Sequence, residues 1–201
     1  MAAVSSPGDG LGRCVLVPIK SFAAAKGRLR DVLDEGERRA LVQSMARHVL
    51  DAAVPLPVYV ACDDPEVAAF ADEAGATVAW TPGLGLNGAV AATIAHLGGL
   101  GASYVTVVHA DLPFAAAIGQ LEDHEGVTLA PDRHRRGTNL LRVPALAGFA
   151  PRFGRDSFRR HQVECERLAL RCTIVDRDDL AFDVDTPSDL EVLRTRRGGT
   201  P

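Results

Sequence analysis

Short apolar runs alternate along the chain with longer segments in which apolar residues recur every three or four positions. The apolar runs predict strands at 13–19, 57–62, 77–80, 103–113, 126–131, 138–143 and 172–176. The periodic segments predict helices at 34–53, 64–76, 156–170 and 186–194, and residues 81–101 are predicted to be a glycine-rich loop that opens into a helix. Asp34, Asp64 and Thr186 are predicted helix caps, and Asp156 or Ser157 is expected to cap the fourth helix. Strands that alternate with helices are typical of an α/β three-layer sandwich with a mainly parallel sheet.

One domain accounts for the predicted ordered part of the chain. The 201 residues, of which 47% are hydrophobic, can form one sizeable core. We expect a disordered N-terminus at 1–12, a single domain at 13–194 and a disordered tail at 195–201. The pattern is looser at 123–155, which predicts an insertion that forms one wall of a pocket.

Charge and composition narrow the classes of partner. The net charge of −4 argues against general affinity for nucleic acid or an anionic membrane. No apolar stretch approaches the roughly 20 residues of a membrane-spanning helix, and the N-terminus lacks the apolar core of a signal peptide. The four cysteines include no CxxC pair. These features predict a cytoplasmic protein with reduced, mostly structural thiols.

A carboxylate ends the most continuous apolar strand of the chain. The run "SYVTVVHADLPF" finishes at Asp111, followed by Leu112 and Pro113. Ligands of open parallel sheets bind at the carboxyl ends of the strands, so Asp111 is expected to face a crevice. The alternative is that Asp111 only caps the turn before Pro113.

A second acidic pair lies near the C-terminus, in "AFDVDTPSDL". If this stretch is extended, Asp183 and Asp185 lie on one face, because side chains two positions apart in a strand point the same way. Together with Asp111 they would form a set of three carboxylates, which is the type of ligand that suits Mg²⁺. The alternative is an exposed Asp183 beside a simple helix cap formed by Asp185 or Thr186.

The loop after the first predicted strand is basic. In "VPIKSFAAAKGRLR", Lys20, Lys26 and Arg28 lie among small residues and could wrap a polyphosphate. The loop lacks the GxxxxGK[ST] pattern, and no GxGxxG follows this strand, so it is neither a Walker loop nor a Rossmann fingerprint. The alternative is a solvated positive surface.

Three further segments could contact ligands. In "GLGLNG", Asn87 carries the amide needed to read a nucleobase edge, or it caps the following helix. Thr138, in "RGTN", and Gly154 and Ser157, in "RFGRDSF", could bind a small anion, since amides at a helix N-terminus do so well. The alternatives are a surface turn and a helix cap.

Histidines are not predicted to act in catalysis. His109 lies in a predicted strand and is expected to be packed, and no Ser/His/Asp or Cys/His set occurs at suggestive positions.

Together these segments resemble the 2-phospho-L-lactate guanylyltransferase family, which makes an early intermediate of the deazaflavin coenzyme F-420. The resemblance spans about residues 13 to 194. It rests on "VPIKSFAAAKGRL", "ADLP", "RGTN", "RFGRDSFRRH" and "DVDTPSDL", in that order and spacing. It implies a nucleotide-diphospho-sugar-transferase-like α/β fold and transfer of GMP from GTP to a small phosphorylated acid. The acid would be 2-phospho-L-lactate, phosphoenolpyruvate or 3-phospho-D-glycerate.

The resemblance also implies roles for individual residues. Nucleotide binding is expected from Pro18, Lys20, Lys26, Arg28, Gly85 and Asn87. Catalysis is expected from Lys20, Lys26, Arg28 and Asp111. Magnesium is expected at Asp111, Asp183 and Asp185, and the acceptor acid at Thr138, Gly154 and Ser157. Basic residues in "DRHRRG" are more numerous than in some relatives, which leaves the acceptor open.

The implied reaction is an in-line displacement at the α-phosphorus of GTP, which releases pyrophosphate. The nucleophile is an acceptor phosphate oxygen that is already anionic, so no strong general base is required. Possible partners are a downstream transferase that consumes the product and a second copy of the chain in a homodimer. The alternatives are a nucleotidyltransferase with a molybdopterin or sugar-phosphate acceptor, a glycosyltransferase of similar fold, and a non-catalytic GTP-binding module.

Overall fold

A mainly parallel sheet of seven strands runs through the centre of the computed structural model, which describes residues 10–198. The strands are β1 (Gly12–Pro18), β2 (Val58–Cys62), β3 (Thr77–Trp80), β4 (Ala102–Val108), β5 (Val127–Pro131), β6 (Thr138–Pro144) and β7 (Cys172–Ile174). Their order is β3-β2-β1-β4-β6-β5-β7. All neighbours are parallel except β6, which is antiparallel to both β4 and β5. The predicted α/β class is confirmed.

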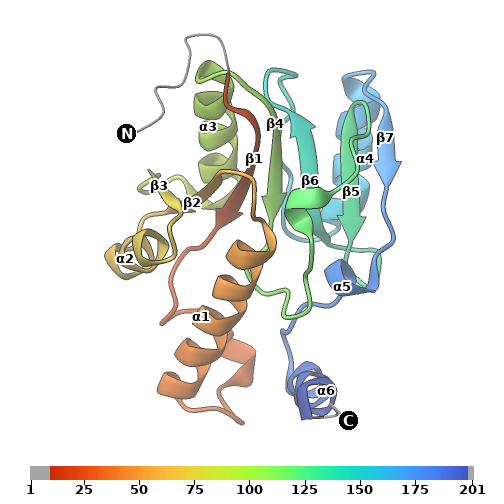
Figure 1. The fold of residues 1–201 in the computed structure, drawn as a ribbon. Coiled ribbons are helices and arrows are strands. Elements are labelled where there is room, and N and C mark those ends of the chain that lie inside the picture. The colour runs from red at the N-terminus through yellow and green to blue at the C-terminus, as the bar shows by residue number, and fades with distance from the viewer. Residues whose placement is uncertain (1–9, 199–201) are drawn as a thin grey trace.

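Helices cover both faces of the sheet (Figure 1). They are α1 (Glu35–Ala52), α2 (Pro65–Glu73), α3 (Gly85–Gly99), α4 (Ser157–Arg167), α5 (Asp178–Ala181) and α6 (Pro187–Gly198), with 3-10 turns η1 (Gly27–Leu29) and η2 (Ile118–Gln120). Helices α1, α2 and α6 share one hydrophobic cluster, and α3 and α4 share another. The molecule is therefore a three-layer sandwich.

Strand β1 shows why the apolar runs are unbroken. Val15 and Val17 belong to the cluster on one face, and Cys14 and Leu16 to the cluster on the other. All four side chains are fully buried. A parallel strand that is covered on both faces has no polar side, which the run "YVTVV" in β4 also reflects.

The predicted caps at Asp34 and Asp64 are confirmed, and at the start of α6 the Thr186 Oγ1 accepts from Asp189 N–H at 3.4 Å. Asp34 forms a capping box with Glu37, each side chain accepting from the other's backbone N–H at 2.8 Å. Asp64 accepts from Glu66 N–H at 2.9 Å. Asp156 precedes α4 but makes no capping hydrogen bond, because its φ of 53° differs from the extended backbone that a side-chain cap requires.

The segment 123–155 differs from the predicted insertion. Its strands β5 and β6 belong to the central sheet, and β6 lies between β4 and β5. Every residue of β5 is buried, so the strand belongs in the interior of the sheet and not in a surface insertion.

The ordered part also extends beyond 13–194, because Gly12 begins β1 and residues 195–198 continue α6. The remaining predicted disordered residues, 1–9 and 199–201, lie outside the described ones. Within residues 10–198, no helix combines the length and the apolar character needed to span a bilayer.

Candidate active site

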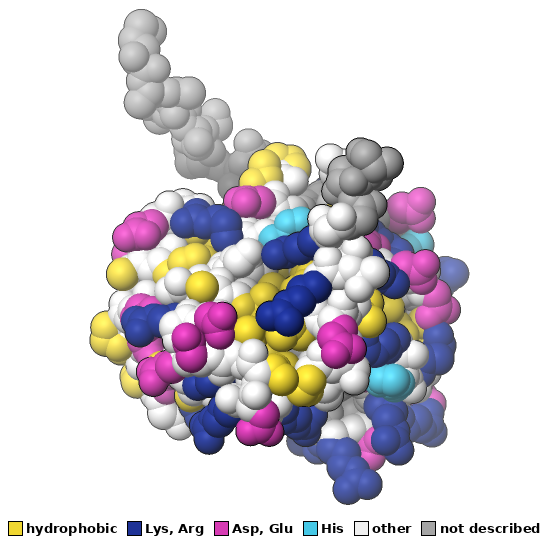
Figure 2. Space-filling view, turned by 90° about the horizontal axis from the view of Figure 1, so that it is seen from below, with side chains coloured by type: hydrophobic (Ala, Val, Ile, Leu, Met, Phe, Trp, Pro, Cys, Tyr) yellow, Lys and Arg dark blue, Asp and Glu magenta, His cyan; other side chains and the backbone are white. Residues whose placement is uncertain are grey.

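A pocket of about 740 Å³ lies at the carboxyl ends of β1, β2 and β4. These ends face the lower edge in Figure 1, and Figure 2 views that edge, where basic and acidic side chains are interspersed around apolar surface. Pro18 and Lys20 contribute from β1 and the loop after it, and Asp63 directly follows β2. Asp111 lies in the loop after β4, because this strand ends at Val108 and not at Asp111 as predicted. Asp185 completes this wall from the segment before α6. The pocket therefore occupies the edge of a parallel sheet where ligands usually bind.

Three carboxylates meet at this edge. Oxygen atoms of Asp111, Asp183 and Asp185 lie within 4.8 Å of one another. Val184, between the two C-terminal aspartates, is fully buried, which turns its neighbours to the opposite side of the chain. The structure thus brings together the three residues that the sequence placed in one set.

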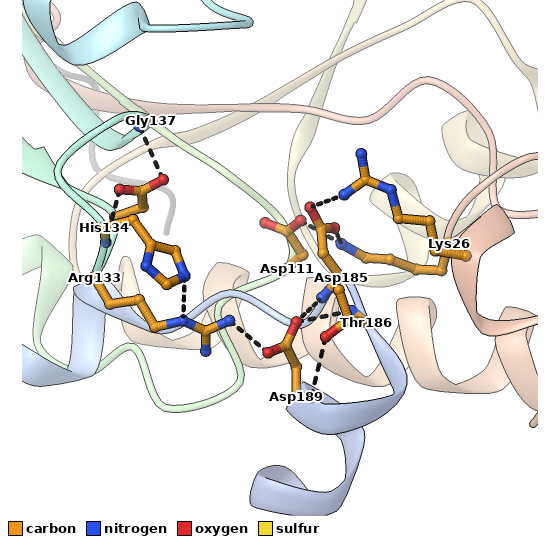
Figure 3. Close-up of polar contacts among 10 residues, drawn as sticks. Lys26, Asp111, Arg133, His134, Gly137, Asp185, Thr186 and Asp189 are labelled. Atoms are coloured by element: carbon orange, nitrogen blue, oxygen red, sulfur yellow. Dashed lines mark hydrogen bonds and ion pairs between the residues drawn. The ribbon is translucent and has the colours of Figure 1, made fainter.

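Lys26 reaches into this carboxylate set (Figure 3). Its Nζ donates to Asp111 Oδ2 and, at 2.7 Å, to Asp185 Oδ1. The Lys26 side chain is only 8% exposed, and its backbone adopts the left-handed conformation, with φ of 54°. Sequence reasoning placed Lys26 in a phosphate-binding loop and did not foresee this contact.

The pKa values of Asp111 and Asp183 are shifted in opposite directions. Burial raises the pKa of Asp111, but the charges of Lys26 and His109 outweigh burial and lower the pKa overall. Burial also raises the pKa of Asp183, and the charges of Asp111 and Asp185 raise it further. Asp111 Oδ1 is buried and has no hydrogen-bond partner among the described residues. The set therefore holds more negative charge and more free oxygen atoms than Lys26 satisfies.

Asp189 holds the acidic turn in place (Figure 3). Its Oδ2 accepts from the backbone N–H groups of Asp185, at 2.9 Å, and Thr186, at 2.8 Å. Its Oδ1 accepts from the Arg133 guanidinium, which comes from the loop after β5. Thr186 is the predicted cap of α6, but nothing in the sequence showed that Arg133 would bond Asp189 at this helix start.

The other predicted nucleotide contacts surround the pocket with few internal partners. Pro18, Lys20, Arg28 and Gly85 all line it. The Arg28 side chain is 77% exposed, with its guanidinium 3.9 Å from Asp185. Gly85 begins α3 with φ of +62° and has open space where a side chain would lie. These groups are accessible to a ligand.

Asn87 is engaged elsewhere. Its Nδ2 donates to Phe153 C=O at 3.1 Å and its Oδ1 accepts from Phe153 N–H at 2.7 Å. It lies inside the first turn of α3, so it is not the cap, and it is absent from the pocket lining. Base reading by Asn87 stays a prediction, and in this structure its amide fastens α3 to the segment before α4.

Asn87→Ala is expected to lower the free energy of unfolding by about 1–3 kcal/mol, because it leaves the N–H and C=O of Phe153 without their partners. Urea unfolding measures this. Gln43→Ala is the control, since within residues 10–198 its amide bonds only the Glu66 side chain, and about 0.5 kcal/mol is expected. Equal losses in the two variants would contradict a fastening role for Asn87.

Two of the three predicted acceptor residues meet in a buried cluster. Thr138 begins β6 and Ser157 begins α4, and their side-chain oxygens are 3.5 Å apart. Both residues are almost fully buried, at 1% and 2% exposure. His161 Nδ1 lies 2.9 Å from Thr138 Oγ1. Gly154 is exposed, with φ of +111°, and its C=O accepts from Ser157 N–H at 3.1 Å.

His161 predicts a pH-dependent stability. Burial lowers its pKa to about 4, with help from the charges of His109 and Arg160 and against that of Glu164. The unfolded chain, with a histidine pKa near 6.5, binds this proton more readily. The stability from neutral His161 is therefore complete above about pH 6.5 and is lost as the pH falls toward 4. Between pH 7 and pH 5 the wild type should lose about 2 kcal/mol more than His161→Asn in urea unfolding. Parallel pH profiles would contradict this.

His109 was predicted to lie in a strand, but it lies just outside β4. β4 ends at Val108, and His109 N–H donates to Asn139 C=O at 3.1 Å just beyond it. The ring lines the pocket and packs on Phe153, with centroids 5.1 Å apart. His109 is thus packed against Phe153, as expected, but because β4 ends before it, the residue also lines the pocket.

The sheet, its covering helices and the acidic pocket define a protein of the nucleotide-diphospho-sugar-transferase fold class. A solved structure assigned to the nucleotide-diphospho-sugar transferases, from Desulfovibrio desulfuricans G20, matches with a TM-score of 0.75 at 17% identity. The match covers 94% of this chain and 88% of that one. The predicted fold is confirmed.

The family can be named more narrowly. The family described as "Guanylyl transferase CofC like" matches residues 13–199, and the chain belongs to it. Phosphoenolpyruvate guanylyltransferase from Sphaerobacter thermophilus is 37% identical, over 89% of this chain and 90% of the relative. The enzyme of the same name from Conexibacter woesei is 36% identical, over 92% and 90%. The resemblance seen in the sequence is confirmed.

Proposed function

We propose that this chain transfers GMP from GTP to phosphoenolpyruvate and releases pyrophosphate, as a step in coenzyme F-420 biosynthesis. The match of residues 13–199 to a guanylyl transferase family carries the reaction type. The names of the relatives favour phosphoenolpyruvate among the three acids considered. A cytoplasmic location, a downstream transferase as partner and a homodimer remain predictions from the sequence.

Asp111, Asp183 and Asp185 would hold Mg²⁺. The fit is supported by their shared position and by the buried, unpaired Oδ1 of Asp111. A bound Mg²⁺ would neutralise charge on the reacting phosphates. Asp189 would keep the two C-terminal aspartates in place through the backbone of their turn.

The basic loop after β1, with Lys20, Lys26 and Arg28, would bind the negatively charged phosphates of the nucleotide. Lys20 and Arg28 are exposed at the pocket and can attract the polyphosphate from solution. Lys26 lies deeper, between two of the carboxylates, and can follow the phosphates as charge shifts toward pyrophosphate. An acceptor phosphate oxygen forms the new bond to the α-phosphorus as the bond to the pyrophosphate oxygen breaks. No side chain needs to remove a proton from that oxygen, because it is anionic at neutral pH.

Thr138, Gly154 and Ser157 would contact the acceptor acid. Thr138 begins β6 beside the end of β4, which leads to Asp111. Ser157 begins the 11-residue helix α4, whose N-terminal dipole favours an anion. Gly154 is exposed and has open space where a Cβ would lie, so its backbone would be accessible to the acid.

Pyrophosphate release tests the acceptor assignment. The protein is incubated with GTP, Mg²⁺ and each of the three acids, with the downstream transferase present to consume a labile product. We expect kcat/KM for phosphoenolpyruvate to exceed that for the other acids. Release with a sugar phosphate alone would favour a related nucleotidyltransferase, and GTP binding without release would favour a non-catalytic module. Either result would overturn the proposal.

A further inference from the structure

His161 is a fully buried histidine on α4 that has no role in the proposed chemistry. Its ring contacts the rings of Phe149 and Phe153, with centroid distances of 5.8 Å and 4.9 Å. Both ring nitrogens have polar partners: Nε2 accepts from Arg152 N–H at 2.9 Å, and Nδ1 lies 2.9 Å from Thr138 Oγ1. An imidazole with two defined partners has a defined orientation.

The partners also determine where the ring carries its proton. A backbone N–H can only donate, so Nε2 must be the nitrogen without a proton. The neutral ring then carries its proton on Nδ1 and donates it to Thr138 Oγ1. Burial keeps the ring neutral near pH 7, since it lowers the pKa to about 4.

This arrangement constrains the hydroxyl of Thr138. Its oxygen accepts from His161, so its own hydrogen must point in another direction. Ser157 Oγ, 3.5 Å away, is placed as a second and weak donor to the same Thr138 oxygen, so it does not take up the Thr138 hydrogen. The Thr138 hydroxyl is thus left as a donor in the cluster at the N-terminus of α4, where an anion is favoured.

We propose that His161 is a positioning residue that keeps the Thr138 hydroxyl oriented as a hydrogen-bond donor to the anionic acceptor acid. The proposal rests on the proposed function, which makes Thr138 an acceptor contact. The alternative is a purely structural role, in which His161 anchors the segment at Arg152 and has no effect on the orientation of the Thr138 hydroxyl.

Two substitutions separate these roles. In His161→Asn, the side-chain N–H can replace Nδ1–H toward Thr138 but does not reach Arg152. In His161→Gln, the side-chain oxygen can replace Nε2 toward Arg152 but supplies no donor at Thr138. We expect His161→Gln to raise the KM for phosphoenolpyruvate about tenfold, the size of one lost hydrogen bond, and His161→Asn to change it less than about threefold. The KM for GTP should stay unchanged in both.

A further variant checks the route of the effect. In a Thr138→Val background the hydroxyl is gone, so adding His161→Gln should raise the acceptor KM no further. The opposite ranking of the two His161 variants, or an additive effect in the Thr138→Val background, would overturn the positioning role.

Nitrogen NMR of ¹⁵N-histidine-labelled wild-type protein at pH 7 tests the same idea without any variant. We expect the ring of His161 to carry its proton on Nδ1, and a proton on Nε2 would overturn the proposal. Wild-type protein that transfers GMP to none of the acids would overturn the proposed function itself. Normal transfer with an unchanged acceptor KM in His161→Gln would overturn only the role of His161.

Discussion

Asp111→Asn is expected to lower the rate of GMP transfer at least about 100-fold while leaving the protein folded. Asp111 contributes a carboxylate to the set of three and directly bonds Lys26. The amide keeps the shape of the side chain but removes the charge that a cation requires. Lys26 keeps its 2.7 Å bond to Asp185, so the fold retains an ion pair at this point.

The measurement is pyrophosphate release under saturating GTP, with thermal unfolding recorded in parallel. Asp176→Asn is the control, because Asp176 is a 67% exposed carboxylate whose one ion pair among the described residues is with Arg135. It should retain near wild-type turnover. Near wild-type turnover in Asp111→Asn would rule out a metal or charge-binding role for this residue.

Lys26→Met is expected to lower the free energy of unfolding in the absence of Mg²⁺ and to enlarge the rise in Tm that Mg²⁺ produces. The Lys26 ammonium is 8% exposed and bonds two carboxylates, whose own side chains are 23% and 46% exposed. Its removal leaves the carboxylates to repel each other, which should cost about 1–3 kcal/mol after allowance for solvent screening. Mg²⁺ would then bind without competition from the ammonium, so it should raise Tm more in Lys26→Met than in the wild type.

Lys20→Met is the matched control for this experiment. Lys20 lies in the same loop and lines the same pocket, but it is exposed and forms no ion pair within residues 10–198. It should change neither the free energy of unfolding nor the Mg²⁺ response. GMP transfer should fall in Lys26→Met. An Mg²⁺-induced rise in Tm that is the same in Lys26→Met and the wild type would show that Lys26 and the metal do not share the site.

The elements could be predicted because burial leaves a local signature. Apolar runs located every strand, and the caps at Asp34 and Asp64 gave two helix starts. The direction of β6 had no such signature. An antiparallel strand that is buried on both faces reads as the same apolar run as a parallel one, so the order of the sheet beyond β4 could not be deduced.

The site was partly predictable for a related reason. Asp183 and Asp185 lie two positions apart, and Asp111 follows the end of β4 by three residues, so periodicity and the rule for sheet edges placed the carboxylates together. Contacts between distant segments carry no such local signal. The bonds of Lys26 to Asp111 and Asp185 link positions 85 and 159 residues apart, and those of Asn87 to Phe153 span 66. These contacts could be recognised only from the three-dimensional structure.

Transfer of label from GTP is the most direct test of the central claim. The protein is incubated with GTP labelled at the α-phosphorus, Mg²⁺ and phosphoenolpyruvate, together with the downstream transferase to consume a labile product. We predict that the label leaves GTP for a product that also contains the acid, in equal amount to the pyrophosphate released. Label that stays in GTP, or that appears only in free GMP, would contradict the account.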